Sequence, residues 1–503
     1  MSINILIIGS GMGGATLAAA LAPTGVRIVM LERGDWLADT PECCDDEAIF
    51  ARQVYRSGEQ WLTPSGDAFH PGNFYYVGGN SKFYGCVMFR YRAQDFDEMQ
   101  HLGGTSPAWP LSYDDFAPWY DKAEAHYGVH GTAGEDPTDP ERGGLYPKPA
   151  VPDEPAIAEV RERLMRAGVS PASLPLALDF KQWQQHRTGS WDGHPDTTGA
   201  KLDAESVGIA QAQQHPNFEL VTGARVTRLL TGTDGQIAEV HYEKGGQGHT
   251  VKPKLVVLSA GAVNSAALLL RSANETNPAG LANSSDLVGR RFMNHNCSAL
   301  MAIHPFRANT AKYQKTLYFN DYYLSGGPED APLGNVQLLG KITSPILQSQ
   351  TRLPKTATDW LTNRSVDWYV MSEDLPSNDS RVTVKDDRIV LDWKRSNWQA
   401  HQALVAQTKT VMRKAGYPIQ LSRPFDRRTP SHQCGTAVFG PDPQSSVLNL
   451  NCRAHDHRNL YVVDASFLPT SAAVNPALTI AAQALRVANH IKHKELKQMD
   501  MAS

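Results

Sequence analysis

The sequence predicts an α/β fold, α+β overall, in which a domain with a parallel sheet is interleaved along the chain with a domain built on an antiparallel sheet. Three observations lead to this prediction. An apolar strand, a glycine-rich turn and a helix open the chain. Period-two, aromatic-rich strands fill residues 297–430. A buried strand and a capped helix follow near the end, and they are expected to return the chain to the first sheet.

Length, charge and cysteine spacing limit the possible class of protein. With 503 residues the chain is too long for one simple core, so two domains are expected. A formal net charge of −4 gives no sign of binding to nucleic acid or to an anionic membrane. The chain has no apolar run of transmembrane length and starts without a basic leader, which favours a cytoplasmic location. The cysteines lack metal-ligand spacing, so no metal site is expected.

The first element is a Rossmann-like strand, turn and helix. Residues 3–8 form an apolar strand, and the motif Gly-Ser-Gly-Met-Gly-Gly follows at once. Gly9 suits the tight turn, Gly11 lets the backbone approach a pyrophosphate, and Gly14 lets helix and strand pack closely. Glu32 ends the next strand, where an acid accepts a hydrogen bond from a ribose hydroxyl. The acid favours FAD or NAD over NADP.

A second glycine-rich stretch spans residues 76–85 and contains Gly78, Gly79, Asn80 and Ser81. Small residues at this density let a backbone wrap closely around a flat or phosphorylated ligand. A surface turn is the alternative, and the apolar flanks on both sides favour the ligand.

The central part of the chain contains elements of both kinds. Helices are expected at residues 112–127 and 155–168. Three period-two runs between residues 218 and 242 predict a small antiparallel ribbon. Residues 254–262 read as a buried strand that returns to the first domain, and Asn264 with Ser265 is expected to cap the next helix.

Residues 297–430 are expected to form the second sheet. Strands are predicted near residues 336–339 and 367–371, and a hairpin over 381–393 turns at two aspartates. A helix follows over residues 397–415. Aromatic strands of this kind form the wall of a substrate pocket, and they are equally good core strands.

The last part of the chain offers a base and a hydrogen-bonding partner. His432 precedes a Gly-Thr pair, and a buried strand at residues 460–463 ends in Asp464. Asn475 is expected to cap a helix with Pro476 at its first position. Because a helix N terminus favours negative charge, a histidine and an asparagine beside it predict a site for proton removal.

These motifs, in this order, resemble those of the glucose–methanol–choline (GMC) oxidoreductases over nearly the whole chain. The resemblance lies in the first glycine motif with Glu32, in Gly78–Ser81, in Ser259–Ser265 and in the segments around His432 and Asn475. It implies an FAD-binding domain of residues 1–92, 200–296 and 431–503, and a substrate-binding domain of residues 93–199 and 297–430.

The resemblance also implies which residues meet the cofactor. Members with covalent flavin carry a histidine in or beside the motif at residues 78–81, so the asparagine and serine here predict non-covalent FAD. The implied cofactor-binding residues are Gly9, Gly11, Met12, Gly13, Gly14, Glu32, Arg33, Gly78, Gly79, Asn80, Ser81, Val226, Ala260, Asp464, Ala465, Asn475 and Pro476.

The implied reaction is oxidation of an alcohol, with His432 as the base, Asn475 as its partner and flavin N5 as the hydride acceptor. The motif sequences at residues 78–85 and 432–436 are similar to those of bacterial glycoside 3-oxidases and 3-dehydrogenases. This similarity implies oxidation at carbon 3 of a sugar or glycoside to a ketone. Another alcohol (pyranose carbon 2, a sterol or a primary alcohol) and a flavin-scaffold lyase remain alternatives. The electron acceptor is O2 or a quinone or cytochrome carrier. Candidate substrate residues are Gln337, Lys341 and Trp393.

Overall fold

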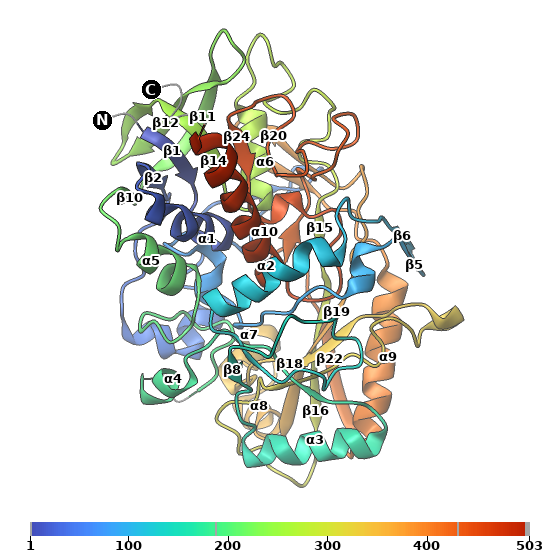
Figure 1. Ribbon diagram of the computed structural model, residues 1–503. Helices are drawn as coiled ribbons and strands as arrows, with labels where there is room; N and C mark the ends of the chain where they lie inside the picture. The colour runs from blue at the N-terminus through green and yellow to red at the C-terminus, as the bar shows by residue number, and fades with distance from the viewer. Residues whose placement is uncertain (1–2, 187–188, 430–431, 498–503) are drawn as a thin grey trace.

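The structure, a computed structural model, describes residues 3–186, 189–429 and 432–497. A parallel sheet lies at one end of the molecule and a large antiparallel sheet at the other (Figure 1). This mixed α/β architecture confirms the predicted fold class. The predicted domain limits at residues 1, 431 and 503 lie outside the described residues.

The parallel sheet gathers strands from four distant stretches of the chain. Its order is β10-β2-β1-β14-β24, and every neighbouring pair is parallel. Because parallel strands end at one edge, this edge collects the residues that follow each strand, where α/β sheets bind their ligands. The strands are β1 Ile3–Ile8, β2 Ile28–Leu31, β10 Phe218–Val221, β14 Pro253–Leu258 and β24 Leu460–Val462.

Three helices cover this sheet on one side. Helix α1, Met12–Leu21, packs against α10, Ala477–His490, and α10 packs in turn against α2, Tyr113–His126 (Figure 1). Helix α2 begins as predicted, because Ser112 and Asp115 form a reciprocal capping box. Helix α1 is almost entirely buried and consists mainly of glycine and alanine, which lets it lie between the sheet and α10.

One predicted strand belongs to a different sheet. Phe218–Val221 was expected in the antiparallel ribbon, but it pairs in parallel with β2. The ribbon consists of β11 Arg225–Thr231, β12 Ile237–Lys244 and β13 Gln247–Val251. An edge strand of a parallel sheet shows the same period-two pattern as a ribbon strand, so local sequence does not separate the two.

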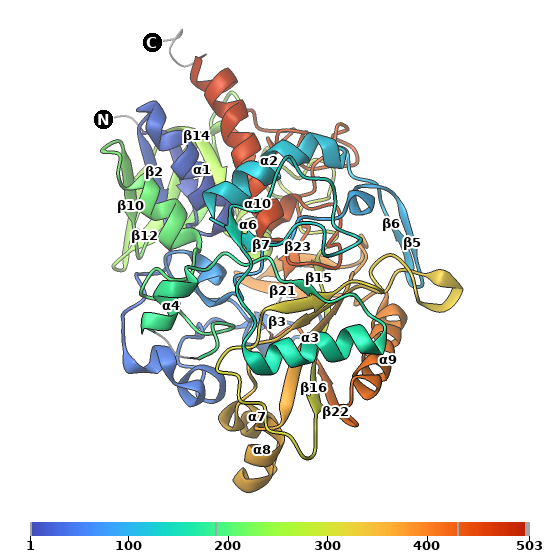
Figure 2. The ribbon, with the colours of Figure 1, turned by 60° about the horizontal axis from the view of Figure 1, so that its bottom comes forward.

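The antiparallel sheet has the order β22-β16-β19-β18-β17-β9. The two faces of the sheet have different surroundings, as β16 shows. Leu300 and Ala302 pack in a hydrophobic core with α9, whereas Ala299 and Met301, on the other face, line a cavity. Helices α3, Pro155–Ala167, and α9, Trp398–Lys414, lie beside this sheet (Figure 2). The strands are β22 Ile419–Pro424, β16 Asn296–Ile303, β19 Ser365–Ser372, β18 Asn335–Leu338, β17 Leu317–Phe319 and β9 Ala172–Ser173.

The predicted hairpin forms but does not extend the large sheet. Strands β20, Arg381–Lys385, and β21, Arg388–Asp392, are joined by Asp386 and Asp387, both with positive φ. Strand β21 pairs with β3, Trp61–Leu62, and β3 pairs with β4, Ala68–Phe69. Strand β20 packs against α6, Ala262–Arg271. The remaining helices and strands are short: α4 Phe180–His186, α5 Ala210–Ala212, α7 Ser344–Gln350, α8 Lys355–Thr362, β5 Met99–His101, β6 Gly104–Ser106, β7 His130–Gly131, β8 Lys148–Pro149, β15 Met293–Asn294 and β23 Gln433–Cys434.

Helix α6 begins earlier than predicted. Asn264 and Ser265 were expected to cap it, but its first residue is Ala262 and no side chain caps it. Ser265 lies inside the first turn, and its hydroxyl accepts from Ala260 N and donates to Asp464. The hydroxyl is therefore used to join two strand ends rather than to start the helix.

Within the described part of the chain, no helix has both the length and the apolar character to cross a bilayer.

Two glycines at the start of α1 offer a matched test of this packing. A Cβ at Gly13 would lie 2.0 Å from Val463 O at the end of β24, whereas a Cβ at Gly11 would meet nothing within 4 Å. We expect Gly13→Ala to lower the free energy of unfolding by about 1–3 kcal/mol or more, because backbone must move. Gly11→Ala should change it by less than about 1 kcal/mol. Urea unfolding measures both, and equal effects would contradict the packing.

Candidate functional site

A large cavity runs from the parallel sheet to the antiparallel one. Its volume is about 1310 Å³. Ligand pockets usually measure about 300–1,000 Å³, so this cavity has room for two molecules side by side. One end is formed by the residues that follow the parallel strands, and the other by the inner face of β16, β19 and β22.

The first glycine motif forms the floor of one end. Gly9 has φ of +99°, and a Cβ there would lie 2.3 Å from Ser259 O, so only glycine fits. Gly14 supports the motif from below: it does not line the cavity and packs against Gly9 O and Ile7. Gly11 is the position that faces open space, as a close approach of ligand to backbone requires.

The predicted acid, Glu32, holds this region together. Its Oε2 accepts from Ser10 N at 2.9 Å and from Ser10 Oγ at 2.7 Å, and its Oε1 accepts from Gly34 N at 2.9 Å. Ser10 Oγ also accepts from Gly78 N at 3.0 Å, so the acid ties both glycine motifs together. Burial raises the pKa of Glu32, and these hydrogen bonds oppose that rise.

The neighbouring predicted residues complete the end of the cavity at the parallel sheet. We call it the nucleotide end, because the sequence predicts a dinucleotide there. The Arg33 guanidinium lies 3.7 Å from the centre of the Tyr75 ring and 3.3 Å from Glu59. Asn80 Oδ1 accepts from Phe74 N, and Ser81 Oγ donates to Gly78 O, so both side chains shape their own loop. The predicted cofactor residues that line the cavity are Gly9, Gly11, Met12, Gly13, Glu32, Arg33, Gly78, Gly79, Asn80, Ser81, Val226, Ala260, Asp464, Ala465, Asn475 and Pro476.

Asp464 lines the cavity and joins the ends of β14 and β24. Its Oδ2 accepts from Gly261 N at 2.9 Å and from Ser265 Oγ, and its Oδ1 accepts from Ser466 N at 2.8 Å. Burial raises the pKa of Asp464, and its hydrogen bonds with Ser265, Ser466 and Gly261 oppose the rise. The carboxylate fixes the turn after β24 that leads the chain to Asn475.

His432 and Asn475 meet at the junction of the two ends, and both line the cavity. Asn475 Nδ2 lies 3.2 Å from His432 Nε2. The strand β23 holds His432 in place, because Gln433 and Cys434 pair with β15. Continuing that antiparallel register sets His432 opposite His295, and their Nδ1 atoms are 2.9 Å apart.

The environment of His432 favours its neutral form. Burial lowers the pKa of His432 well below its ordinary value, and the nearby His295 and Lys315 add to the effect. A neutral imidazole in a cavity can accept a proton from a bound group, which is what a general base requires.

Asn475 does not cap the last helix as predicted. Helix α10 starts at Ala477, and Pro476 O accepts its first hydrogen bond, from Ile480 N at 3.0 Å. The Asn475 side chain turns away from the helix, toward His432 and Gln337. Both ends of its amide are used by other side chains, and so it is not available for capping.

The three candidate substrate residues have different surroundings. Lys341 lines the cavity, although its Nζ donates to Thr362 O at 2.6 Å and Ser365 O at 2.9 Å. Gln337 and Trp393 are not among the described residues that line it. Gln337 Nε2 donates to Asn475 Oδ1 at 2.9 Å, so Gln337 acts on the site through Asn475.

Trp393 supports the site from farther away. Its Nε1 donates to Asp374 Oδ2 at 2.8 Å, and the same oxygen accepts from Asn294 N, next to His295. Burial raises the pKa of Asp374 to about 6. The indole therefore helps to hold β15 rather than to contact a ligand.

Sequence reasoning missed His295 and the pair of Lys315 and Asp192. Lys315 Nζ lies 2.6 Å from Asp192 Oδ2, and both line the cavity. His295 stands in an Asn-His-Asn run with no recognisable motif. Its importance comes from the pairing of β15 with β23, which joins segments more than 130 residues apart.

The end of the cavity at the antiparallel sheet, here called the substrate end, has both apolar and polar walls. Apolar side chains come from β16, β19 and β22, from α7, from the segment 47–51 and from loops beside them, and Arg56, Lys341 and Arg423 are among the polar side chains. The apolar side chains are Ile49, Phe50, Met301, Leu339, Ile342, Ile346, Leu347, Tyr369, Leu421 and Phe425.

Comparison with protein families identifies the class of protein. Two family models, both described as GMC oxidoreductase, match residues 5–297 and 376–484. The chain therefore belongs to the GMC oxidoreductase family, and it is an oxidoreductase that acts on CH–OH groups. This confirms the resemblance seen in the motifs.

Named relatives within the family share nearly the whole chain. The chain is 31% identical to 6'''-hydroxyparomomycin C oxidase of Streptomyces lividus and 30% identical to paromamine 6'-oxidase of Streptomyces fradiae. In both cases the match covers 97% of this chain and 91% of the relative. The chain is also 25% identical to the fructose dehydrogenase large subunit of Gluconobacter japonicus, over 99% of both chains.

Solved structures show the same fold. Pyridoxine 4-oxidase from Mesorbium loti superposes with a TM-score of 0.67 at 20% identity, covering 98% of this chain and 99% of that chain. An FAD-dependent oxidoreductase from Chaetomium thermophilum also has a TM-score of 0.67, at 15% identity, with coverage of 98% and 100%.

FAD is the cofactor that the family implies, and the residues present fit it. Helix α1 has no side-chain cap and no acid in its first turn, and the open position Gly11 stands at its start. Such an N terminus binds phosphate. The cavity continues from there past Glu32 and Asp464 to the His432 region, which suits a long dinucleotide.

The low pKa of His432 predicts the pH dependence of the reaction. Because burial favours the neutral ring, His432 stays unprotonated as the pH falls through about 6.5, the ordinary histidine pKa. We expect the rate of flavin reduction by an alcohol to be constant from pH 8 to about 6.5, and to fall only in more acidic solution. Anaerobic stopped-flow measurements test this. An acid limb with an apparent pKa of about 6.5 or above would contradict it.

Proposed function

We propose that this protein oxidises a secondary hydroxyl of a sugar or glycoside, at carbon 3, to a ketone with non-covalent FAD. One observation supports this above the others: His432 Nε2 and Asn475 Nδ2 face one cavity, 3.2 Å apart, where the nucleotide end meets the substrate end. The relatives named for oxidation of paromamine and fructose favour a sugar alcohol. The choice of carbon 3 as the oxidised position is based on the motif sequences at residues 78–85 and 432–436.

His432 and Asn475 divide the work on the hydroxyl. His432 Nε2 takes the hydroxyl proton, and Asn475 Nδ2 donates to the same oxygen and fixes its direction. The chemistry that FAD supplies when bound is acceptance of the hydride from the carbinol carbon, which leaves the ketone. The N terminus of α10, at Pro476 and Ala477, lines the same region without a capping side chain and favours negative charge there.

The cavity wall narrows the substrate further. Away from the nucleotide end, the carboxylates among the described lining residues are Asp192 and Asp426, and both are ion-paired, with Lys315 and Arg428. A substrate with several ammonium groups would find no free carboxylate there. The apolar part of the wall instead fits a neutral sugar joined to an apolar aglycone. A sterol alcohol fits the same wall and is the alternative substrate.

Non-covalent binding of FAD is supported by the side chains around the cavity. The described histidines that line it are His70 and His432. Both nitrogens of His432 are hydrogen-bonded, and His70 contacts Glu59 O and Gln60. These hydrogen bonds of both rings favour non-covalent binding.

The proposed division of the chain follows the two sheets. The parallel sheet draws its strands from residues 1–92, 200–296 and 431–503, which we assign to FAD binding. The antiparallel sheet draws its strands mainly from residues 297–430, with β9 from 93–199, which we assign to substrate binding.

The reaction is tested by anaerobic bleaching of the flavin. Glucose, an aryl glucoside, a sterol, a primary alcohol and an aminoglycoside are added separately, and we expect the aryl glucoside to bleach fastest and to give the 3-ketone. Fast reoxidation in air would identify an oxidase, and slow reoxidation a dehydrogenase. A yellow protein that no alcohol bleaches would overturn the proposal and favour the lyase.

His432→Ala tests the role of the base. We expect flavin reduction to slow by roughly 100-fold or more, as for loss of a general base, with FAD content and substrate affinity retained. A rate within about threefold of wild type, at normal substrate affinity, would remove His432 from the chemistry.

Acid precipitation tests the state of the flavin. We expect all yellow colour in the supernatant, with the spectrum of free FAD. A yellow pellet would show a covalent bond, and loss of that colour in His70→Gln would locate it.

A further inference from the structure

We propose that two hydrogen-bond chains, which reach His432 from opposite sides, fix it as the tautomer with its proton on Nδ1 and its Nε2 lone pair turned to the substrate. One chain runs through His295, and the other through Asn320, Asn335 and Gln337. None of these four is among the described residues that line the cavity, so they are positioning residues. The proposal rests on the proposed role of His432 as the base.

The first chain begins at two backbone carbonyls. His295 Nε2 lies 2.8 Å from Ser471 O and 2.9 Å from Ala472 O. Carbonyl oxygens only accept, so Nε2 must carry the proton. Because burial lowers the pKa of His295, the ring is neutral and its Nδ1 has a bare lone pair. The partner at 2.9 Å, His432 Nδ1, must then donate, which leaves His432 Nε2 unprotonated.

The loop that carries these carbonyls is held in an unusual shape. Ala472 has φ of +53°, a left-handed conformation that is unfavourable for a residue other than glycine. Tyr323 Oη accepts from Ala473 N, and Ser471 Oγ donates to Asp374 O, so the loop is held on both sides. The conformation directs two successive carbonyls at one N–H group, which is a reason for the strain to persist.

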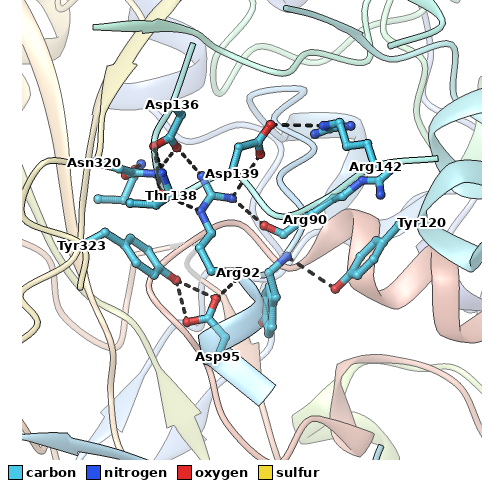
Figure 3. A network of polar contacts seen from close by, with 12 residues as sticks. Arg90, Arg92, Asp95, Tyr120, Asp136, Thr138, Asp139, Arg142, Asn320 and Tyr323 are labelled. Carbon is cyan, nitrogen blue, oxygen red and sulfur yellow. Dashed lines mark hydrogen bonds and ion pairs between the residues drawn. The ribbon is translucent and has the colours of Figure 1, made fainter. Parts of the chain in front are cut away.

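The second chain begins at a buried ion pair. Asp136 Oδ2 accepts from Arg92 at 2.7 Å and from Asn320 Nδ2 at 2.8 Å (Figure 3). Burial alone would raise the pKa of Asp136, but Arg92 and the hydrogen bonds lower it, so the group is an ionised carboxylate. A carboxylate only accepts, and therefore the amide nitrogen of Asn320 must face it.

Each later amide is oriented by the one before it. Asn320 Oδ1 accepts from Asn335 Nδ2 at 2.8 Å, and Asn335 Oδ1 accepts from Gln337 Nε2 at 2.8 Å. Gln337 Nε2 uses its second hydrogen for Asn475 Oδ1, at 2.9 Å. The nitrogen of Asn475 is therefore the atom that faces His432, and it donates to Nε2.

The reverse orientation fails at the anchored end. Turning the Gln337 amide would set its Oε1 against the oxygens of Asn335 and Asn475, and correcting that would turn Asn320 Oδ1 toward the Asp136 carboxylate. As it stands, Gln337 Oε1 is buried without a partner among the described residues. A buried hydrogen bond left unmade is unfavourable, and this one is tolerated because it preserves the direction of the row of amides.

The two hydrogen-bond chains reach different nitrogens of His432 and agree on one protonation state. The first protonates His432 Nδ1 and the second presents an N–H to Nε2, so both leave the Nε2 lone pair as the acceptor. When an alcohol binds, its hydroxyl can take over donation to Nε2 while its oxygen accepts from Asn475 Nδ2. The base is thus set before the substrate arrives, which is the advantage of a preorganised site.

The test is the tautomer itself. Holoenzyme labelled with ¹⁵N-histidine is examined by NMR at pH 7 without substrate, and the His432 signals are assigned by their loss in His432→Gln. We expect a neutral ring with the proton on Nδ1. A proton on Nε2, or on both nitrogens, would overturn the proposal. If His432→Gln does not fold, loss of the same signals in His432→Asn provides the assignment.

Gln337→Met tests the second chain, because it frees the Asn475 amide to turn. We expect a fraction of His432 to move its proton to Nε2, and flavin reduction to slow by roughly tenfold with little change in KM. Gln314→Met is the matched control, since Gln314 is also buried and hydrogen-bonded but contacts neither chain. An unchanged tautomer in Gln337→Met, or the same change in Gln314→Met, would show that Gln337 does not set the tautomer of His432.

Failure of the proposed function is distinguishable from failure of this inference. A Nδ1 proton on His432 in a protein that no alcohol bleaches would overturn the function and support the chains. Alcohol oxidation by an enzyme whose His432 carries its proton on Nε2 would support the proposed function and overturn the inference that the two hydrogen-bond chains fix the tautomer.

Discussion

The pairing of β24 with β14 is the interaction on which the site depends. It sets Val256–Leu258 in parallel register with Leu460–Val462, so a segment near the end of the chain lies next to strands from its beginning. Parallel strands finish at one edge, and the residues after β24 therefore emerge beside the first glycine motif. Gly13 allows this approach, since any side chain there would collide with Val463 O. Asp464 then fastens the join through Gly261 and Ser265.

Buried polar groups do most of the positioning around the cavity. A buried ion pair such as Arg92 with Asp136 adds little net stability, because desolvation offsets the attraction. Such a pair does supply a fixed acceptor from which neighbouring amides take their direction. In a low-dielectric interior, an amide turned the wrong way leaves two acceptors or two donors facing each other, which is unfavourable. The orientation of each amide therefore determines that of the next. Orientation, more than stability, is what the pair contributes here.

Much of the local structure followed from the sequence. The strand, glycines and helix at the start, the capping box at Ser112 and the hairpin turn at Asp386 and Asp387 are governed by neighbours within a few residues. The predictions that were wrong share one cause. Phe218–Val221 and Ser265 carry signals that fit two roles, and a distant partner decides between them. Asn475 likewise could cap a helix, but Gln337 and His432 engage its amide instead.

The sequence by itself determined the family, the residue types able to do the chemistry and the order of the elements that carry them. Those features depend on local propensity and on motifs whose spacing is fixed by a turn or a helix. The tertiary structure decided which distant strands pair, that His295 lies against His432, and which way each amide turns. These outcomes depend on contacts between segments more than a hundred residues apart, and on donors and acceptors that have to match along a whole chain of side chains. No local sequence pattern encodes such matching, because the orientation of each amide is set by the charged group at the far end of the hydrogen-bond chain.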